Sequence, residues 1–129
     1  MLFTIDGEPR GKQRPRHTKA GIVYTPTETT HYEKAVKAAY IQAGGKMIEG
    51  PVKVEVWAFM KIPTSLSGKK ASALNGVPAD KRPDIDNILK IIYDGLQGVA
   101  FADDKQVTET IAHKVYNPVA RVVVDVQAV

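Results

Sequence analysis

The most constraining feature of the sequence is a strict alternation between residues 51 and 62. Every second position is apolar, and charged or aromatic residues occupy the positions between. The apolar set is Val52, Val54, Val56, Ala58, Met60 and Ile62. Because successive side chains of a strand point to opposite faces, this period of two predicts a long β-strand with one face in a core. Trp57 and Phe59 indicate that the second face is half covered as well.

Two segments have the periodicity of amphipathic helices. The first, residues 28–43, ends at Gly44-Gly45, and Thr30 with Glu33 has the spacing of a capping box. Its inward face is expected to contain Tyr32, Ala35, Val36, Ala39 and Ala43. The second, residues 87–97, ends at Gly98 and has an apolar stripe at positions 85, 88, 89, 92, 96 and 99. Both helices are expected to pack on a sheet.

The remaining elements are shorter or less regular. Strands are predicted at 2–5 and 22–24, and at 107–116 and 119–126, where a tight turn at Asn117-Pro118 predicts a hairpin. Residues 7–21 are expected to be a loop, and residues 63–83 a long connection with a short helix near 67–74. This order predicts a single domain over residues 1–129, of mixed α/β (α+β) class, with helices packed on a small mixed sheet.

Composition excludes several classes of protein. The chain has no cysteine, which removes disulfides, thiolate metal sites and cysteine nucleophiles. It has no apolar run of about 18 residues and no signal-peptide pattern at its start, so we expect a cytoplasmic protein without membrane contact. Residues 1–20 hold five basic and two acidic side chains, whereas residues 80–105 hold six acidic and four basic ones. This layout is typical of a protein that grips a polyanion and binds a cation beside it.

Four aspartates lie close to the helix predicted at 87–97. Asp84 and Asp86 precede or open it, Asp103 and Asp104 follow it, and Lys90 lies one turn inside. Clustered carboxylates repel each other unless a cation offsets them, and carboxylates without histidine or cysteine are typical ligands of magnesium. We therefore expect a divalent ion here if residues 99–102 bring the second pair back towards the first. The histidines are too far apart in the sequence to indicate zinc.

Each of these residues also has a purely structural interpretation. Asp84 or Asp86 can cap the helix, and Asp103-Asp104 can form a turn. Lys90 can form an intrahelical ion pair with Asp86. Beside a metal-bound phosphate, in contrast, the same ammonium can hold the attacking water or offset charge that grows on phosphorus.

Three segments resemble the RusA family of Holliday junction resolvases (crossover junction endodeoxyribonucleases), small endonucleases common in phages and prophages. Residues 82–96 read RPDIDNILKIIYDGL and residues 99–107 read VAFADDKQV, which is similar to the core motif of that family. The opening GEPRGKQRPRHTKAGIVYTP at 7–26 is also similar. The likeness covers nearly the whole chain and implies a RusA-like fold.

The resemblance implies a function in DNA recombination and repair. A homodimer would make symmetric paired nicks in a four-way (Holliday) junction, because its two-fold axis presents identical sites to two equivalent strands. The cofactor would be Mg²⁺, with Mn²⁺ as a substitute. The implied catalytic residues are Asp84, Asp86, Lys90 and Asp104. The implied metal ligands are Asp84, Asp86 and one of Asp103 or Asp104, with Asp104 favoured. DNA contacts are implied for Arg10, Lys12, Arg14, Arg16, Lys19, Lys69, Lys70, Lys81 and Arg82.

Two other functions stay open at this point. A nucleic-acid-binding phage accessory protein without catalysis would keep the basic loop and use the aspartates as caps. A nuclease that acts on RNA or DNA flaps would keep the acidic site and differ in substrate. For Tyr24 and Tyr32, packing is favoured over stacking on a base.

Overall fold

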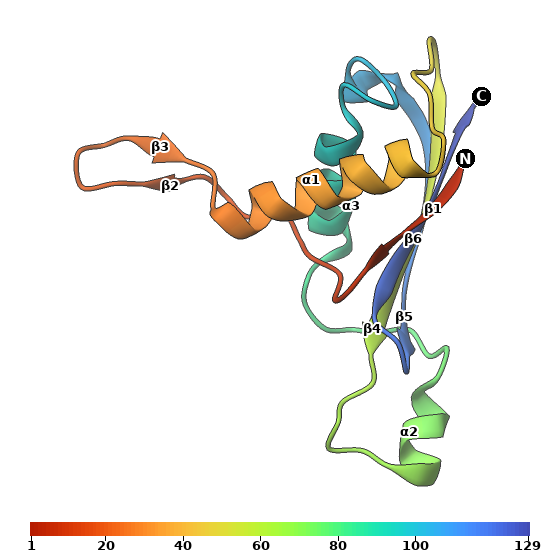
Figure 1. The fold of residues 1–129 in the computed structure, drawn as a ribbon. Helices are drawn as coiled ribbons and strands as arrows, with labels where there is room; N and C mark the ends of the chain where they lie inside the picture. The colour runs from red at the N-terminus through yellow and green to blue at the C-terminus, as the bar shows by residue number, and fades with distance from the viewer.

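The computed structural model describes residues 1–129 as a four-stranded mixed sheet with two long helices on one face (Figure 1). The strand order is β1-β6-β4-β5. The strands are β1 (Leu2–Asp6), β4 (Val52–Lys61), β5 (Val107–Asn117) and β6 (Arg121–Ala128), and the long helices are α1 (Thr27–Gln42) and α3 (Ile85–Leu96). Strand β6 runs antiparallel to β1 and β4, whereas β5 runs parallel to β4. The predicted α+β class is confirmed.

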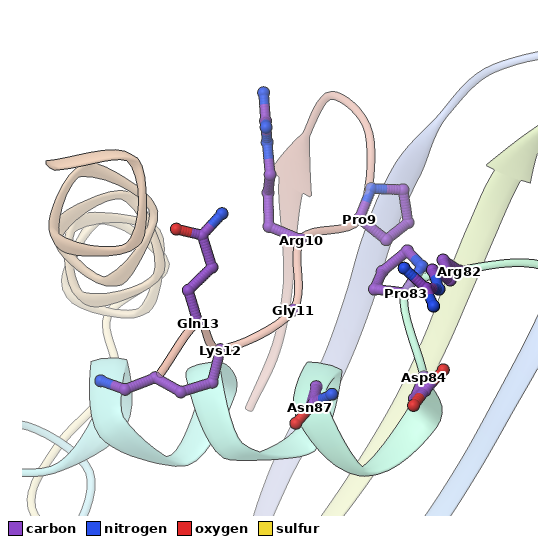
Figure 2. Close-up of a pocket in the computed structure, with 9 residues that line it drawn as sticks. All are labelled: Pro9, Arg10, Gly11, Lys12, Gln13, Arg82, Pro83, Asp84 and Asn87. Atoms are coloured by element: carbon purple, nitrogen blue, oxygen red, sulfur yellow. The ribbon is translucent and has the colours of Figure 1, made fainter. Parts of the chain in front are cut away.

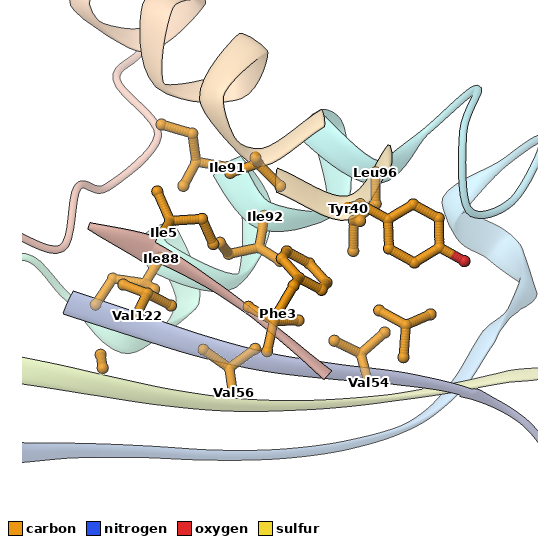
Figure 3. Close-up of a cluster of buried hydrophobic side chains, with 14 of the residues drawn as sticks. Phe3, Ile5, Tyr40, Val54, Val56, Ile88, Ile91, Ile92, Leu96 and Val122 are labelled. Carbon is orange, nitrogen blue, oxygen red and sulfur yellow. The ribbon is translucent and has the colours of Figure 1, made fainter. Parts of the chain in front are cut away.

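The core lies between the sheet and the two helices (Figure 3). The alternation in β4 is realised, because its even-numbered residues from 52 to 60 are buried while the odd-numbered ones are half-buried or exposed. Strands β1 and β6 add a second row of apolar side chains, which consists of Phe3, Ile5, Val122, Val124 and Val126. The ring of Tyr40 from α1 meets Phe3 edge-on, with 5.5 Å between ring centroids.

The second face of the sheet is half covered by its own side chains, as predicted. Trp57 stacks on His113 of the neighbouring strand with 4.0 Å between ring centroids. The guanidinium of Arg121 lies 4.1 Å from the centroid of the Phe59 ring. These cross-strand contacts cover apolar surface that no helix reaches.

Both helices bury part of the face that the sequence pattern predicts. In α3 the predicted Ile88, Ile92 and Leu96 are buried, but Ile85 is exposed and Ile91, outside the predicted stripe, is buried. In α1 the buried residues are Thr29, Tyr32, Val36 and Tyr40. The predicted inward positions Ala35 and Ala43 are exposed, because the stripe of larger side chains, three or four residues apart, faces the core instead.

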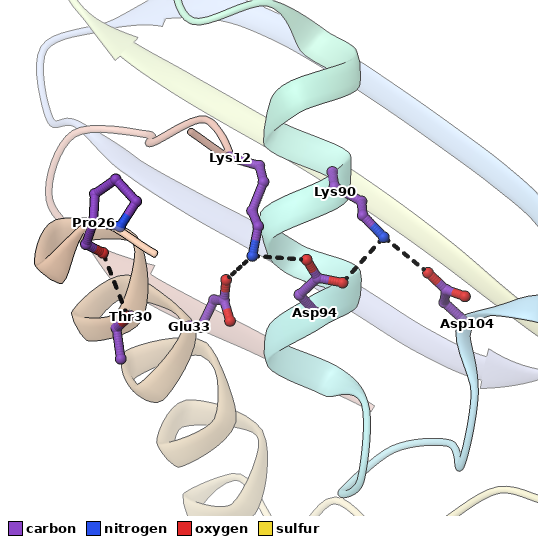
Figure 4. Close-up of polar contacts among 7 residues, drawn as sticks. All are labelled: Lys12, Pro26, Thr30, Glu33, Lys90, Asp94 and Asp104. Atoms are coloured by element: carbon purple, nitrogen blue, oxygen red, sulfur yellow. Dashed lines mark hydrogen bonds and ion pairs between the residues drawn. The ribbon is translucent and has the colours of Figure 1, made fainter. Parts of the chain in front are cut away.

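Helix α1 begins without the predicted capping box. Its N-cap residue is Pro26, which offers no side-chain acceptor, and the hydroxyl of Thr30 donates to the Pro26 carbonyl at 3.4 Å (Figure 4). Glu33 turns instead towards Lys12 of the N-terminal loop. A capping box needs Ser or Thr at the N-cap itself, and here the helix starts earlier in the chain.

The two helices approach closely because residue 95 is glycine. A Cβ built on Gly95 would lie 2.7 Å from Cβ of Val36 and 3.0 Å from the carbonyl oxygen of Glu33. Both distances are too short for any larger residue without movement of α1. Gly95 therefore sets how near α3 comes to α1 and holds the polar edge of α3 beside the N-terminal loop.

Strands β5 and β6 do not form the predicted hairpin. Strand β4 lies between them, so that Trp57 is paired with His113 on one side and with Val123 on the other. The turn itself exists, since Asn117 Oδ1 accepts hydrogen bonds from the Val119 N–H at 2.9 Å and from Arg121 at 3.0 Å. A turn reverses the chain but does not determine which strand the returning segment joins.

The long connection between β4 and α3 follows the outer edge of β5. It contains the predicted short helix, α2 (Gly68–Leu74), and residues 76–79 then pair with β5. The Ala79 N–H donates to the Lys114 carbonyl at 2.9 Å. The Lys114 ammonium donates to the carbonyl oxygens of Lys81 and Pro83 at 2.6 and 2.9 Å. These bonds fix the segment that leads into α3.

Residues 14–25 form a two-stranded arm that projects away from the sheet and helices (Figure 1). Its strands are β2 (Arg16–His17) and β3 (Val23–Tyr24), and the turn between them closes with a hydrogen bond of 2.8 Å from the Thr18 N–H to the Ile22 carbonyl. The strand predicted at 22–24 is confirmed. Strand β2 was expected to be loop, because two polar residues carry no alternation signal. No helix of the chain has the length and apolar character needed to cross a membrane.

Candidate active site

Asp84 and Asp86 lie at the start of α3 with exposed carboxylates. Asp84 is the N-cap residue, yet its side chain makes no capping hydrogen bond. Asp86, in the first turn, accepts a hydrogen bond of 3.0 Å from the Asn87 N–H. The capping role that the sequence allowed for Asp84 is therefore not realised. Both carboxylates lie at the helix end where backbone N–H groups favour negative charge.

Asp103 and Asp104 lie in the turn before β5, and their carboxylates do different things. Asp103 is the N-cap of a short 3-10 helix, η1 (Asp104–Gln106), with which it forms a capping box. Its Oδ1 accepts from the Lys105 N–H at 2.9 Å, and this hydrogen bond lowers the pKa of Asp103. Gln106 ties the turn to the body by donating to the carbonyl oxygens of Ile48 and Gly50, both at 3.0 Å. The turn interpretation thus holds for Asp103.

The contact between Asp104 and Lys90 joins the second acidic segment to the middle of α3 (Figure 4). The Lys90 ammonium donates to Oδ2 of Asp104 at 3.3 Å and lies 3.2 Å from Oδ1 of Asp94. The second segment does return to the helix, but it meets Lys90 rather than the Asp84 and Asp86 carboxylates at the helix start. The predicted pair between Lys90 and Asp86 is wrong, because Lys90 pairs one turn onward, with Asp94. The hydrogen bond to Asp94, followed by that to Asp104, raises the pKa of Lys90 above its ordinary value.

A chain of alternating charges continues from Lys90 into the protein (Figure 4). The Lys12 ammonium lies 3.0 Å from Oδ2 of Asp94 and donates to Glu33 of α1. Burial, the largest single influence, acts to lower the pKa of Lys12, but the two carboxylates together raise it above 10.5. The DNA contact implied for Lys12 stays a prediction. In the structure its ammonium pairs with carboxylates of α1 and α3 and so joins the N-terminal loop to both helices.

Asp94 and Glu33 are site residues whose partners sequence reasoning missed. Asp94 had a signal, since it continues the four-residue spacing of Asp86 and Lys90 along α3. Glu33 had none, because its contact with Lys12 joins residues 21 positions apart.

A polar pocket of about 560 Å³ opens beside Asp84 (Figure 2). Its lining consists of Pro9, Arg10, Gly11, Lys12, Gln13, Arg82, Pro83, Asp84 and Asn87. The loop is held against α3 by a hydrogen bond of 2.8 Å from the Lys12 N–H to the Asn87 carbonyl. Gly11 permits this approach, since a Cβ there would lie 2.9 Å from Cβ of Pro83. Arg82 and Asp84 lie together on the segment that leads into α3, whereas Arg10 lines the pocket from the N-terminal loop, with its side chain directed away from Asp84 (Figure 2).

The other basic residues lie in three separate places. Arg14, Arg16 and Lys19 are exposed on the projecting arm. Lys69 and Lys70 are exposed on α2, which lies at the far end of the sheet from the arm (Figure 1). The Lys81 ammonium donates to the Lys61 carbonyl at 3.3 Å and lies over the ring of Tyr116. Of the nine predicted DNA contacts, Arg10, Lys12 and Arg82 line the pocket with Asp84.

The donor atoms of the acidic residues suit a hard cation, but they are not assembled into a closed cage. Asp84, Asp86 and Asp104 offer carboxylate oxygens alone, which is the ligand type that Mg²⁺ takes. No group of three or more acidic or histidine side chains in the chain is close enough to hold a metal ion as the side chains lie. Asp104 is paired with Lys90 in this arrangement.

Comparison with known proteins supports the reading of these segments. The chain matches the family described as Endodeoxyribonuclease RusA over residues 6–127, a range that includes the pocket, both acidic segments and the whole of α1 and α3. It is also similar to "Uncharacterized protein YqaN" of Bacillus subtilis (strain 168), with 32% identity over 138 aligned positions that cover 100% of this chain and 96% of that protein. The chain therefore belongs to the RusA endodeoxyribonuclease family.

Proposed function

We propose that this protein is a magnesium-dependent endonuclease that hydrolyses phosphodiester bonds at four-way DNA junctions. Family membership suggests this activity. The observation that carries the proposal is the contact of 3.3 Å between Lys90 and Asp104, which ties the Asp104 turn to the helix that begins at the pocket of Asp84, Arg10 and Arg82. Phosphodiester hydrolysis needs carboxylates to hold a metal ion and cations to receive phosphate.

Asp84, Asp86 and Asp104 are the proposed ligands of the divalent ion. Asp84 makes no capping bond, and the carboxylate of Asp104 faces Lys90 rather than its own turn. Asp103 is the weaker candidate because its carboxylate caps η1. When bound, the ion supplies a Lewis acid for the phosphoryl oxygen and lowers the pKa of a bound water. Lys90 can release Asp104 to such an ion without losing all pairing, since Asp94 stays as its partner.

Lys90 is proposed to act as a fixed cation beside the phosphate. Two carboxylates favour its charged form and restrain the end of a long, flexible side chain. A positive charge that is already in place when negative charge grows on phosphorus stabilises the transition state without reorganisation. Asp94, held in turn by Lys12, is the group that positions this ammonium.

Arg10 and Arg82 are proposed to receive phosphates of the DNA strand at the pocket, and the cations of the arm extend the contact beyond it. Guanidinium groups suit this role because they can bind phosphate oxygens in pairs. We further propose a homodimer, because two symmetric nicks in a junction require two identical sites.

Cleavage of a synthetic four-way junction tests the proposal. The purified chain should nick opposing strands of the junction with Mg²⁺ and should be inactive with a chelator. Asp86→Asn, which removes charge but keeps size, should abolish nicking and leave junction binding intact. Asp125→Asn, on the face of the sheet that is turned away from the two helices, is the matched control and should cleave at the parental rate.

One observation favours a second candidate function, a nucleic-acid-binding accessory protein without catalysis. As the side chains lie, no three acidic or histidine side chains are close enough to share a metal ion. This alternative predicts junction binding without nicking, in Mg²⁺ and in Mn²⁺, and no effect of Asp86→Asn. If the protein nicked linear RNA or DNA flaps in preference to the junction, the proposed acidic site would stand, but the proposed substrate would be wrong.

A further inference from the structure

The arm formed by residues 14–25 exposes apolar side chains that nothing else in the chain covers. Ile22, Val23 and Tyr24 are 63%, 57% and 45% exposed. The expectation that Tyr24 packs in the protein is wrong, whereas Tyr32 is buried as expected. A two-stranded hairpin is only marginally stable alone in water, so the arm gains stability from a partner that covers its apolar side chains.

The pairing of the arm gives its two faces different chemistry. Arg16 is opposite Tyr24, and His17 is opposite Val23. Directly opposed residues of an antiparallel pair share a face, so one face combines a guanidinium with an aromatic ring while Val23 points to the other. Arg16 forms no ion pair in the chain, and Tyr24 takes part in none of the aromatic or cation–π contacts. Both groups are therefore free for a ligand.

The charge of the arm identifies the class of partner. Residues 9–27 contain five basic side chains and no acidic one. Such a segment favours a polyanion over a neutral protein surface, and the root of the arm leads into the pocket that carries Arg10 and Asp84. A nucleic acid offers both things that the Arg16–Tyr24 face lacks: phosphate for the cation and a flat apolar surface for the ring.

We propose that this face recognises the branch point of DNA, where Tyr24 stacks on a base while Arg16 binds the neighbouring phosphate. The proposal rests on the proposed function and names how the same protein selects branched over linear DNA. Inside a duplex both faces of a base pair are covered by its neighbours, whereas the base pairs that border a branch offer a face when the junction opens. Phosphate contacts position a protein on DNA but do not by themselves distinguish such a site.

Binding measurements on the full chain without divalent metal test this proposal. Dissociation constants are compared for a four-way junction and a linear duplex built from the same sequences, at one fixed salt concentration. Tyr24→Ala should weaken junction binding by about 5- to 150-fold, the factor that corresponds to the loss of one base–aromatic stack, and should leave duplex binding nearly unchanged. Tyr24→Phe, which keeps an aromatic ring, should keep the parent's preference for the junction over the duplex. Val23→Ala removes an exposed apolar side chain from the opposite face and should bind both DNAs as the parent does.

A second measurement reports the contact itself. A 2-aminopurine base at the branch should lose fluorescence when the parent protein or Tyr24→Phe stacks on it, and should not do so with Tyr24→Ala. An unchanged junction-to-duplex ratio for Tyr24→Ala overturns the proposal. So does a loss of binding that accompanies a change in oligomeric state by sedimentation, because the ring would then cover a second copy of the chain.

The outcome is separable from that of the proposed function. These measurements require no cleavage. If the protein binds junctions through Tyr24 but never nicks them, the proposed nuclease activity is refuted and the proposed role of Tyr24 is supported. If the parent and Tyr24→Ala nick junctions with equal efficiency, the nuclease activity is supported and the role of Tyr24 is refuted.

Discussion

Replacing Lys12 by methionine should destabilise the fold by about 1–3 kcal/mol. Methionine keeps much of the aliphatic stem but removes the charge, so Glu33 loses its ion pair and Asp94 keeps Lys90 alone. Removing one partner of a fully buried pair costs about 3–5 kcal/mol, whereas exposed pairs contribute about 0–1 kcal/mol. The side chains of Lys12, Glu33 and Asp94 are 24%, 22% and 20% exposed, so the expected cost lies between these limits.

The pH dependence of this effect has a definite sign. The folded protein holds the pKa of Lys12 above its ordinary value of 10.5. A raised pKa means that the stabilisation is fully present below the unfolded pKa and is lost as the pH rises through the folded one. The difference in unfolding free energy between the parent and Lys12→Met should therefore be constant from neutral pH to about pH 10 and shrink above it.

Urea unfolding followed by the fluorescence of Trp57, the single tryptophan, measures this difference. The matched control is Lys19→Met, on the exposed arm and without an ion pair, which should change stability by less than about 0.5 kcal/mol. If Lys12→Met were as stable as the parent and as Lys19→Met, the ion pairs of Lys12 would contribute no more free energy than an ordinary surface pair. That result would contradict the larger contribution expected from their partial burial.

Three further predictions concern packing, catalysis and DNA contact. Gly95→Ala should lower the unfolding free energy by about 1–3 kcal/mol in thermal melts, because its Cβ would lie 2.7 Å from that of Val36, and Val36→Ala in the same chain should recover part of the loss. Lys90→Met should abolish junction nicking while the circular dichroism spectrum stays that of the parent, since the side chain is half exposed. Arg14→Ala and Arg16→Ala should each weaken binding to every DNA shape and reduce the salt slope by about one; unchanged binding for both would remove the arm from the interface.

Local patterns in the sequence predicted elements better than they predicted partners. The alternation in residues 52–62 and the apolar stripe of α3 each identify an element and the face that it buries, because both are properties of a single segment. The prediction of a hairpin between β5 and β6 was wrong. Asn117-Pro118 determines only that the chain reverses, whereas the position of β4 between the two strands depends on long-range packing. Strand β2 is too short to carry a pattern of its own.

The candidate site shows the same division. The length of α3 and the turn after it allowed the Asp104 segment to return to the helix, and it meets the helix at Lys90 rather than at Asp86. The role of Lys12 could not be predicted from the sequence, because the two carboxylates that pair with it come from α1 and α3, whose approach depends on tertiary packing. Glu33 illustrates the difficulty, since its spacing from a threonine suggested a helix cap and the fold uses it to hold a lysine.

A magnesium titration of the parent, Asp86→Asn and Asp104→Asn, followed by thermal melting, tests most directly whether carboxylates from two segments share one divalent ion. An ion that binds only the folded chain should stabilise the parent by about 2.7 kcal/mol at a hundred times its dissociation constant. If the two segments share one ion, the melting temperature of the parent rises with Mg²⁺, and the melting temperatures of Asp86→Asn and of Asp104→Asn do not. A parent that does not respond, or two variants that respond as fully as the parent, would contradict this claim.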